Sequence, residues 1–138
     1  MMKLAPYLFF DGQCEAAFTA YQRILGGRIE AMLRYEGSPV DIAPEWRSKI
    51  MHACLELDDG QMLMASDAPP EQSTGPMRSV HVSVTVKEPA EAERIFAALA
   101  EGGTVTMPMA ETFWAPRFGM LGDRYGALWM IGCEPAAA

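Results

Sequence analysis

The chain has 138 residues, 50% of them hydrophobic and 21% charged, a composition typical of one compact globular domain. Its formal net charge is −7, and no basic patch offsets this charge, so we expect no nucleic-acid partner. No apolar run approaches the ~20 residues of a membrane span, and the N-terminal segment lacks a signal-peptide core. We therefore expect a soluble, cytoplasmic protein with no membrane partner.

The first half of the chain predicts the element order β-α-β-β-β. Period-two and helical apolar patterns, bounded by glycine and proline, separate these elements. The predicted strands are 4–10, 28–35, 52–57 and 61–66, the helix is 13–25, and the long polar loop is 37–49. Gly26-Gly27 ends the helix, because glycine adopts the left-handed conformation that terminates helices.

The second half repeats this order after a segment rich in proline and glycine. The predicted strands are 80–86, 104–109, 118–121 and 127–132, and the helix is 89–101. Gly102-Gly103 ends this helix and lies 76 residues beyond Gly26-Gly27. The hairpin ending in Met130 lies 66 residues beyond the one ending in Met64, and the longer first loop accounts for the difference. This is an internal repeat, with module 1 at about 3–67, a linker at 68–78 and module 2 at about 79–133.

Several signatures resemble the PhnB-like branch of the vicinal-oxygen-chelate superfamily, which contains glyoxalases, bleomycin-resistance proteins and extradiol dioxygenases. The resemblance covers nearly the whole chain. It rests on Pro6-Tyr7-Leu8-Phe9-Phe10-Asp11-Gly12, Leu25-Gly26-Gly27, Met51-His52-Ala53, Phe113-Trp114, Arg117-Phe118-Gly119-Met120-Leu121 and Trp129-Met130. It implies an α+β fold in which two βαβββ modules form a glyoxalase-like half-open barrel with the helices outside. It also implies a homodimer, in which the proline-rich linker would allow exchange of modules.

The resemblance also implies where a metal would bind, on the first and last strand of each module. Those positions fall on Pro6, Met64, His81 and Met130. Only the histidine suits a hard divalent cation, because proline has no donor and thioether sulfur is a soft ligand. We therefore expect no metal and no other cofactor. Should a metal bind, His52, Glu56 and His81 are the set that could improvise a site.

The alternation of the strands predicts an apolar, methionine-lined cavity. If Val80, Val82, Val84 and Val86 face the helix, then His81, Ser83 and Thr85 face the concavity. The candidate pocket residues are Met62, Met64, His81, Ser83, Trp114, Arg117, Leu128 and Met130. Apolar walls with a few polar groups are typical of small-molecule pockets.

Individual residues leave alternatives open. His81 is the best catalytic candidate, since a histidine can orient a ligand or act as a base, but a hydrogen-bonded strand histidine fits equally well. Trp129 is expected in the core, and Trp114 in the core, at a pocket rim or at a dimer contact. Arg117 pairs with Asp123 or with an anionic ligand, and Asp123 caps its own turn.

Other residues are weaker candidates. Tyr35, Asp67 and Glu111 are possible rim groups. Cys14, Cys54 and Cys133 have no metal-type spacing and are expected to be buried, reduced thiols.

The sequence leaves the function open between classes. We favour a metal-free protein that binds a small molecule. The alternative is a metal-dependent lyase, isomerase or dioxygenase of the glyoxalase superfamily, which needs a Lewis acid. Domains of this kind also carry the name of a demethylubiquinone methyltransferase, but the GxGxxG turn of a nucleotide-type cofactor is absent.

Overall fold

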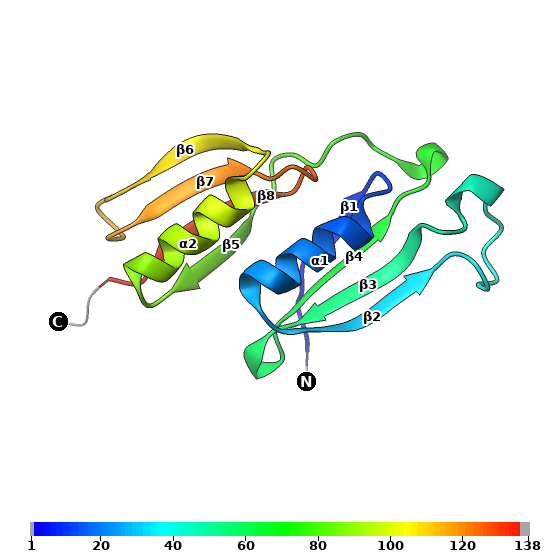
Figure 1. The fold of residues 1–138 in the computed structure, drawn as a ribbon, viewed down its shortest axis with the longest axis horizontal. Coiled ribbons are helices and arrows are strands. Elements are labelled where there is room, and N and C mark those ends of the chain that lie inside the picture. The colour runs from blue at the N-terminus through cyan, green and yellow to red at the C-terminus, as the bar shows by residue number, and fades with distance from the viewer. Residues whose placement is uncertain (1, 136–138) are drawn as a thin grey trace. The chain divides into compact units, whose positions relative to one another are not determined.

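The computed structural model describes residues 2–135 and divides into two compact units between Gly75 and Pro76. Each unit contains one sheet and one α-helix (Figure 1). Within the described residues, no helix is long and apolar enough to cross a membrane.

Module 1 has the order β-α-β-β-β. Its elements are β1 (Tyr7–Phe10), α1 (Cys14–Leu25), β2 (Arg28–Arg34), β3 (Ile50–Glu56) and β4 (Met62–Asp67). The sheet order is β1-β4-β3-β2, with β1 parallel to β4 and the other pairs antiparallel. Short 3-10 turns occur at Pro44–Trp46, Asp58–Gly60 and Pro70–Gln72.

Module 2 has the same order and topology. Its elements are β5 (Val82–Val86), α2 (Pro89–Ala100), β6 (Thr104–Ala110), β7 (Phe118–Gly122) and β8 (Leu128–Cys133). The sheet order β5-β8-β7-β6 repeats that of module 1 strand for strand. The predicted α+β class with two βαβββ modules is confirmed.

The first strand of each module is shorter than predicted. β1 begins at Tyr7 rather than Leu4, and Leu4 is 97% exposed. β5 begins at Val82, so Val80 and His81 precede the strand. Val80 is 74% exposed, and the prediction that it faces the helix is wrong. Strand pairing ends at these positions, so apolar character alone overestimates the strand.

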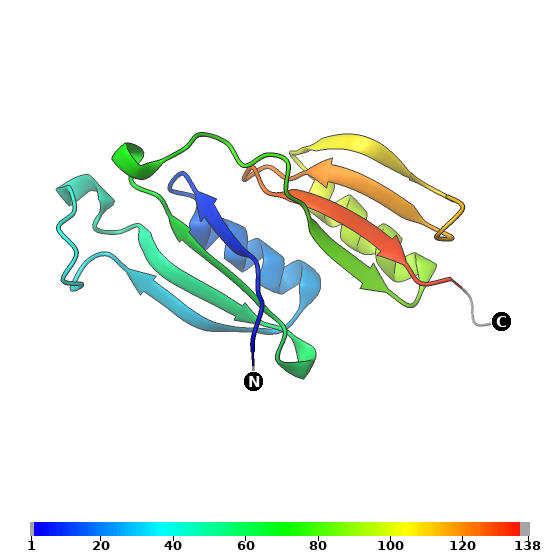
Figure 2. The same ribbon diagram turned by 180° about the vertical axis from the view of Figure 1, so that it is seen from behind.

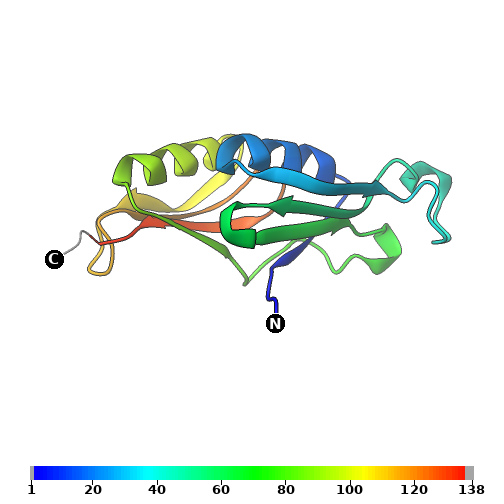
Figure 3. The ribbon, with the colours of Figure 1, turned by 90° about the horizontal axis from the view of Figure 1, so that it is seen from below.

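Each helix covers one face of its own sheet (Figure 3). α1 buries a stripe that includes Ala17, Phe18, Tyr21 and Ile24, at the spacing of one helical face. Phe10 of β1 packs edge-on against Phe18, with ring centroids 6.4 Å apart. Burying each such side chain stabilises the module by roughly 1.5–3 kcal/mol.

The paired glycines that end the helices have a second structural role. A Cβ on Gly27 would lie 2.4 Å from the carbonyl oxygen of Glu56, and one on Gly103 would lie 2.2 Å from that of Gly122. Both contacts are shorter than any side chain tolerates, so the chain entering β2 or β6 passes directly against the neighbouring strand. Gly27 and Gly103 are therefore required because a side chain would collide with the neighbouring strand. Gly26 and Gly102 are required because the turn holds them at φ +82° and +75°.

Candidate functional site

Strand pairing aligns the two modules residue by residue. In module 1 a row of directly paired residues crosses the sheet from Tyr7 to Met64, Cys54 and Ala31. In module 2 the corresponding row is Ser83, Met130, Met120 and Met107. The counterparts differ by 76 before the long loop and by 66 after it, as the glycines and hairpins predicted.

These rows lie on the side of each sheet that faces away from its helix. In module 1, Leu8 and Phe10 are buried against α1, whereas Tyr7 and Phe9 are 39% and 58% exposed. Figure 2 shows β1 and β4 in front of α1, so this face is in view. We call it the open face of module 1; it comprises Tyr7, Phe9, His52, Cys54, Met62 and Met64.

The open face of module 2 is defined in the same way. A Cβ on Gly119 would lie 2.7 Å from a ring carbon of Phe96 on α2, and Trp129 and Ile131 are fully buried. The alternate residues therefore face away from the helix. They are Ser83, Thr85, Met107, Met120, Leu128 and Met130, and the row includes three adjacent methionines, all half-buried.

The predicted alternation of the last strands is confirmed. Met62, Met64, Leu128 and Met130 are half-buried, whereas Leu63, Ala65, Trp129 and Ile131 between them are buried. The core position of Trp129 is thereby confirmed. The sequence reasoning missed Met107 and Met120, because β6 and β7 are paired with register irregularities that obscure a simple alternation.

The register corrects one expected correspondence. Tyr7 matches Ser83, so the counterpart of His81 is Ala5 rather than Pro6. Pro6 instead shares the alternation of Leu8 and Phe10, which face the helix. Proline and alanine both lack a donor side chain, so this position offers no ligand in either alignment. His81 itself is half-buried just before β5.

On module 1, Tyr7 and His52 form a contact that the sequence analysis did not predict. The hydroxyl of Tyr7 lies 3.1 Å from Nδ1 of His52, and the two rings are stacked at 5.8 Å with an interplanar angle of 25°. The residues are 45 positions apart. Neither the apolar strand around Tyr7 nor the short strand around His52 carries a signal of this contact.

Trp114 lies on the exposed connection between β6 and β7. It is 46% exposed and packs edge-on against Phe118 at 5.2 Å and against Phe113 at 4.7 Å. Phe113 is 97% exposed. The core alternative for Trp114 is therefore wrong, and the prediction of a rim or contact position stands.

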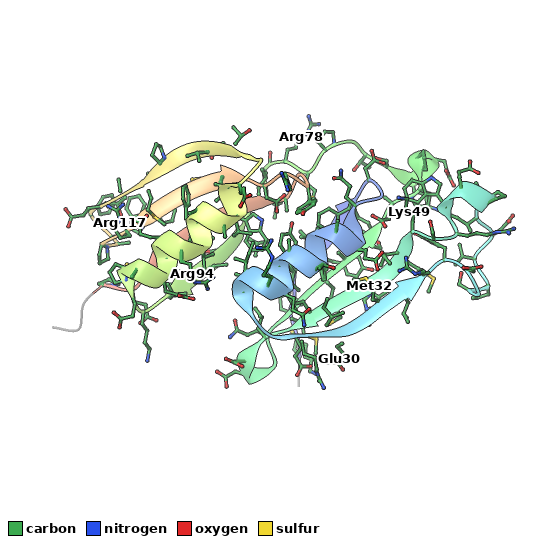
Figure 4. All side chains as sticks on the ribbon, in the orientation of Figure 1. Glu30, Met32, Lys49, Arg78, Arg94 and Arg117 are labelled. Atoms are coloured by element: carbon green, nitrogen blue, oxygen red, sulfur yellow. The ribbon has the colours of Figure 1, made fainter. Side chains whose placement is uncertain are left out.

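Arg117 pairs with Glu93 of α2, not with Asp123 as expected. Its Nε donates to the Glu93 carboxylate at 2.6 Å and its terminal nitrogen donates to the Met109 carbonyl at 3.3 Å. Arg117 is labelled in Figure 4. The ion pair is part-exposed, so a guanidinium edge still faces solvent. The spacing of carboxylates along α2 gives no sign of this contact with Arg117, which precedes β7.

Asp123 caps its own turn, as predicted, and also holds the core tryptophan. One carboxylate oxygen accepts from the backbone N–H groups of Tyr125 and Ala127, and the other accepts from Trp129 Nε1 at 2.8 Å. The carboxylate is 7% exposed.

Asp67 is a buried structural group and not a rim residue. Its carboxylate accepts from the backbone N–H groups of Cys14 and Ile50, both at 2.9 Å. The Tyr35 hydroxyl donates to its carbonyl at 2.7 Å, and Tyr35 is 7% exposed. The rim assignments of Asp67 and Tyr35 are therefore wrong, whereas Glu111 is exposed.

All three cysteines are buried and free, as predicted. Burial, and to a lesser extent the nearby carboxylates of Asp67 and Glu15, raise the pKa of Cys14 from 9.0 to about 12. In the unfolded chain this thiol ionises first, so folding stability should be unaffected below pH 9.0 and fall as the pH rises towards 12.

Urea unfolding on either side of pH 9.0 measures this dependence. In Cys14→Ala, the free energy of unfolding should fall less as the pH rises. Cys133→Ala removes another buried thiol and serves as the control for the stability lost when a buried side chain is shortened. An unchanged alkaline slope in Cys14→Ala would show that other groups cause the loss.

The paired βαβββ modules, each with a helix on one face and an open face opposite, define a protein of the glyoxalase/bleomycin-resistance/dioxygenase fold. The glyoxylase/bleomycin resistance protein/dioxygenase domain from Frankia sp. EAN1pec has a TM-score of 0.66 at 13% identity, covering 98% of this chain and 97% of that chain. At this identity the likeness concerns the fold alone.

Within that class the family is shown by sequence. The family model described as 3-demethylubiquinone-9 3-methyltransferase matches residues 2–132, and the chain belongs to this family. It is a PhnB-like member of the vicinal-oxygen-chelate superfamily, as its signatures predicted.

Three relatives illustrate the match. Protein PA1353 from Pseudomonas aeruginosa is 46% identical with a TM-score of 0.91, covering 97% of this chain and 98% of that chain. Protein YjdN from Escherichia coli K12 is 33% identical, covering 94% of each. A putative 3-demethylubiquinone-9 3-methyltransferase, PhnB protein, from Bacillus cereus is 26% identical with a TM-score of 0.79, covering 96% of this chain and 99% of that chain.

Proposed function

We propose that this protein binds an apolar small molecule on its methionine-rich open faces without a metal ion. The observation that carries the proposal is the row of three adjacent methionines, Met107, Met120 and Met130, ending at Ser83. Thioether side chains are flexible and polarisable, so they adapt to ligands of varied shape. The pocket residues of the proposal are Met62, Met64, His81, Ser83, Trp114, Arg117, Leu128 and Met130.

Donor chemistry supports the metal-free part of the proposal. Met64 and Met130 occupy the last-strand positions, and their sulfur atoms prefer a soft ion such as Cu(I) to zinc, nickel or manganese. The corresponding position before β1 is Ala5 or Pro6, which has no donor side chain, so His81 is the one residue among these positions suited to a hard cation.

The metal-dependent lyase, isomerase or dioxygenase remains the alternative from a different class. It would need the improvised set of His52, Glu56 and His81. Alternation along β3 places His52 and Glu56 on the same side of the module 1 sheet, but His52 is hydrogen-bonded to Tyr7 and Glu56 is ion-paired with Arg28. Among the described residues, no three His, Cys, Asp or Glu side chains gather as metal ligands would.

The methyltransferase activity in the family's description has weaker support from this chain. The turn from β1 to α1, Asp11-Gly12-Gln13, contains one glycine, whereas a nucleotide-type cofactor site is expected to have a GxGxxG turn there. Transfer of a labelled methyl group from S-adenosylmethionine to a quinol would restore this activity as the leading function.

A cytoplasmic homodimer completes the proposal, with the proline-rich linker at residues 68–78 allowing modules to be exchanged between chains. Light scattering should give the mass of two chains; the mass of one chain would remove the dimer from the proposal.

Methionine methyl resonances provide the test of ligand binding. In metal-stripped protein, 2-methylnaphthalene should shift the methyl signals of Met64, Met120 and Met130, while Met2, which is 92% exposed, should not respond. Met130→Ala should weaken binding by about fivefold because apolar contact area is lost, and Met2→Ala should leave the affinity unchanged. Absence of shifts on both open faces, or equal effects of the two substitutions, would refute the proposal.

A further inference from the structure

The open face of module 1 carries a cluster of aromatic and imidazole rings in addition to its methionines. Phe9 and Tyr7 on β1 have ring centroids 5.2 Å apart, and Tyr7 stacks in turn on His52 of β3. Phe9 is 58% exposed and Tyr7 39% exposed. We call Phe9, Tyr7 and His52 the ring cluster.

The ring cluster joins β1 to β3 across the strand between them. β4 lies between β1 and β3, and Tyr7 is paired directly with Met64 on that strand. The Tyr7 side chain therefore reaches over β4 to meet His52. Two apolar side chains of the open face neighbour Tyr7: Phe9, whose ring contacts it, and Met64, which is paired with it on β4.

After Tyr7 and His52 have hydrogen-bonded to each other, the pair can still form further hydrogen bonds with a ligand. If the phenol donates to Nδ1, its oxygen can still accept and Nε2–H can still donate. If Nδ1–H donates to the phenol oxygen, the hydroxyl can still donate and Nε2 can still accept. In both tautomers the pair offers one donor and one acceptor, and within residues 2–135 neither side chain has a second hydrogen-bond partner.

The local charges do not favour an anion over a neutral group. Two carboxylates and two cations interact where β2 begins and β3 ends: Arg28 and Glu30 lie on β2, Glu56 lies on β3, and Lys3 precedes β1. With these charges balanced and a chain charge of −7, an oxygen that both donates and accepts hydrogen bonds fits the pair better than a carboxylate does.

We propose that the ring cluster is a subsite for a planar aromatic ring that carries a neutral oxygen substituent. The ring contacts Phe9 and Met64, and its hydroxyl hydrogen-bonds to the Tyr7–His52 pair. Tyr7 and His52 act together as the specificity-determining unit. This inference rests on the proposed function, because it assumes that the open face binds a small molecule at all.

A matched pair of probes tests the subsite in the full chain. We expect 2-naphthol to bind about three- to tenfold more tightly than 2-methylnaphthalene, the difference that one net hydrogen bond supplies. Tyr7→Phe and His52→Phe should each bring this ratio to about one while changing the affinity for 2-methylnaphthalene less than twofold. The double variant should lose no more than either single variant, because the two residues form one unit.

Two further variants separate specificity from general disturbance. His52→Gln keeps a hydrogen-bonding side chain and should retain part of the preference, which loss of packing alone would not allow. Tyr125→Phe removes a hydroxyl from the turn between β7 and β8 and should leave the ratio at the wild-type value.

The outcomes distinguish this inference from the proposed function. If 2-methylnaphthalene binds and the hydroxyl adds no affinity, or if the preference survives Tyr7→Phe, the subsite is wrong while ligand binding stands. If neither probe shifts a methionine resonance on either open face, the proposed function fails and the subsite fails with it.

Discussion

Replacing Asp67 with alanine should lower the free energy of unfolding of module 1 by about 3 kcal/mol, because two charge-assisted hydrogen bonds are lost together. The carboxylate is 1% exposed and accepts from the backbone N–H groups of Cys14 and Ile50. Cys14 is the first residue of α1, whose N-cap residue Gln13 makes no side-chain cap. Asp67 therefore supplies from β4 the cap that the local sequence lacks, at the helix end that favours negative charge.

Amide hydrogen exchange together with urea unfolding measures this effect. The Cys14 and Ile50 amides should lose protection far more than amides of α2 do. Asp41→Ala, an exposed aspartate in the loop before β3, should change stability by less than about 0.5 kcal/mol. If Asp67→Ala destabilised module 1 no more than Asp41→Ala does, then Asp67 would not organise the junction of α1, β3 and β4.

Replacing Asp123 with alanine should destabilise module 2 by about 3 kcal/mol, because the fully buried Trp129 loses its carboxylate partner at Nε1. The same substitution removes the acceptor for two turn amides between β7 and β8. Trp129→Phe should also be destabilising, by about 2 kcal/mol, since it loses both the hydrogen bond and ring volume.

A double-mutant cycle separates these contributions. Because Asp123 and Trp129 are in direct contact, their substitutions should be non-additive by about 1 kcal/mol. Trp114→Phe makes the same chemical change at a half-exposed site and should cost much less. Strict additivity of Asp123→Ala and Trp129→Phe would mean that the carboxylate serves the turn alone.

The fold was predictable because its signals are local and repeated. Gly26-Gly27 and Gly102-Gly103 end helices at equivalent places, and strand pairing confirms the same offset from Tyr7 to Ser83 and from Ala31 to Met107. Alternation within β4 and β8 also identified which residues face away from the helices. Strand ends were less predictable, because pairing with a neighbour, and not hydropathy, decides where β1 and β5 begin.

The turn cap at Asp123 was predictable because it is local, whereas the polar contacts of Arg117 and Asp67 were not, since they join residues far apart in sequence. Arg117 has a carboxylate six residues away at Asp123, yet it pairs with Glu93, 24 residues away on α2. Asp67 is the last residue of β4, and the residues around it give no sign that its carboxylate reaches Cys14, 53 residues away. Sequence spacing reveals partners on one helix or one turn, whereas these contacts depend on which strands become neighbours.

The two open faces show why family membership does not define the chemistry here. Relatives of this fold class carry names as different as dioxygenase, bleomycin resistance protein and methyltransferase. In each module one face of the sheet packs against α1 or α2, so the open face is where we propose that a ligand binds. In this chain both open faces carry methionines, and on module 2 three of them are adjacent; thioether side chains favour adaptable apolar contact.

Metal-free ligand binding is tested most directly by measuring the affinity for 2-methylnaphthalene with and without metal. Elemental analysis of the same untagged preparation gives its metal content. We expect far less than one equivalent of manganese, iron, nickel or zinc, and an affinity that neither EDTA nor metal add-back changes. Stoichiometric metal that is lost in His81→Ala, together with binding that requires it, would contradict the proposal. The metal-dependent enzyme would then be the better description of this protein.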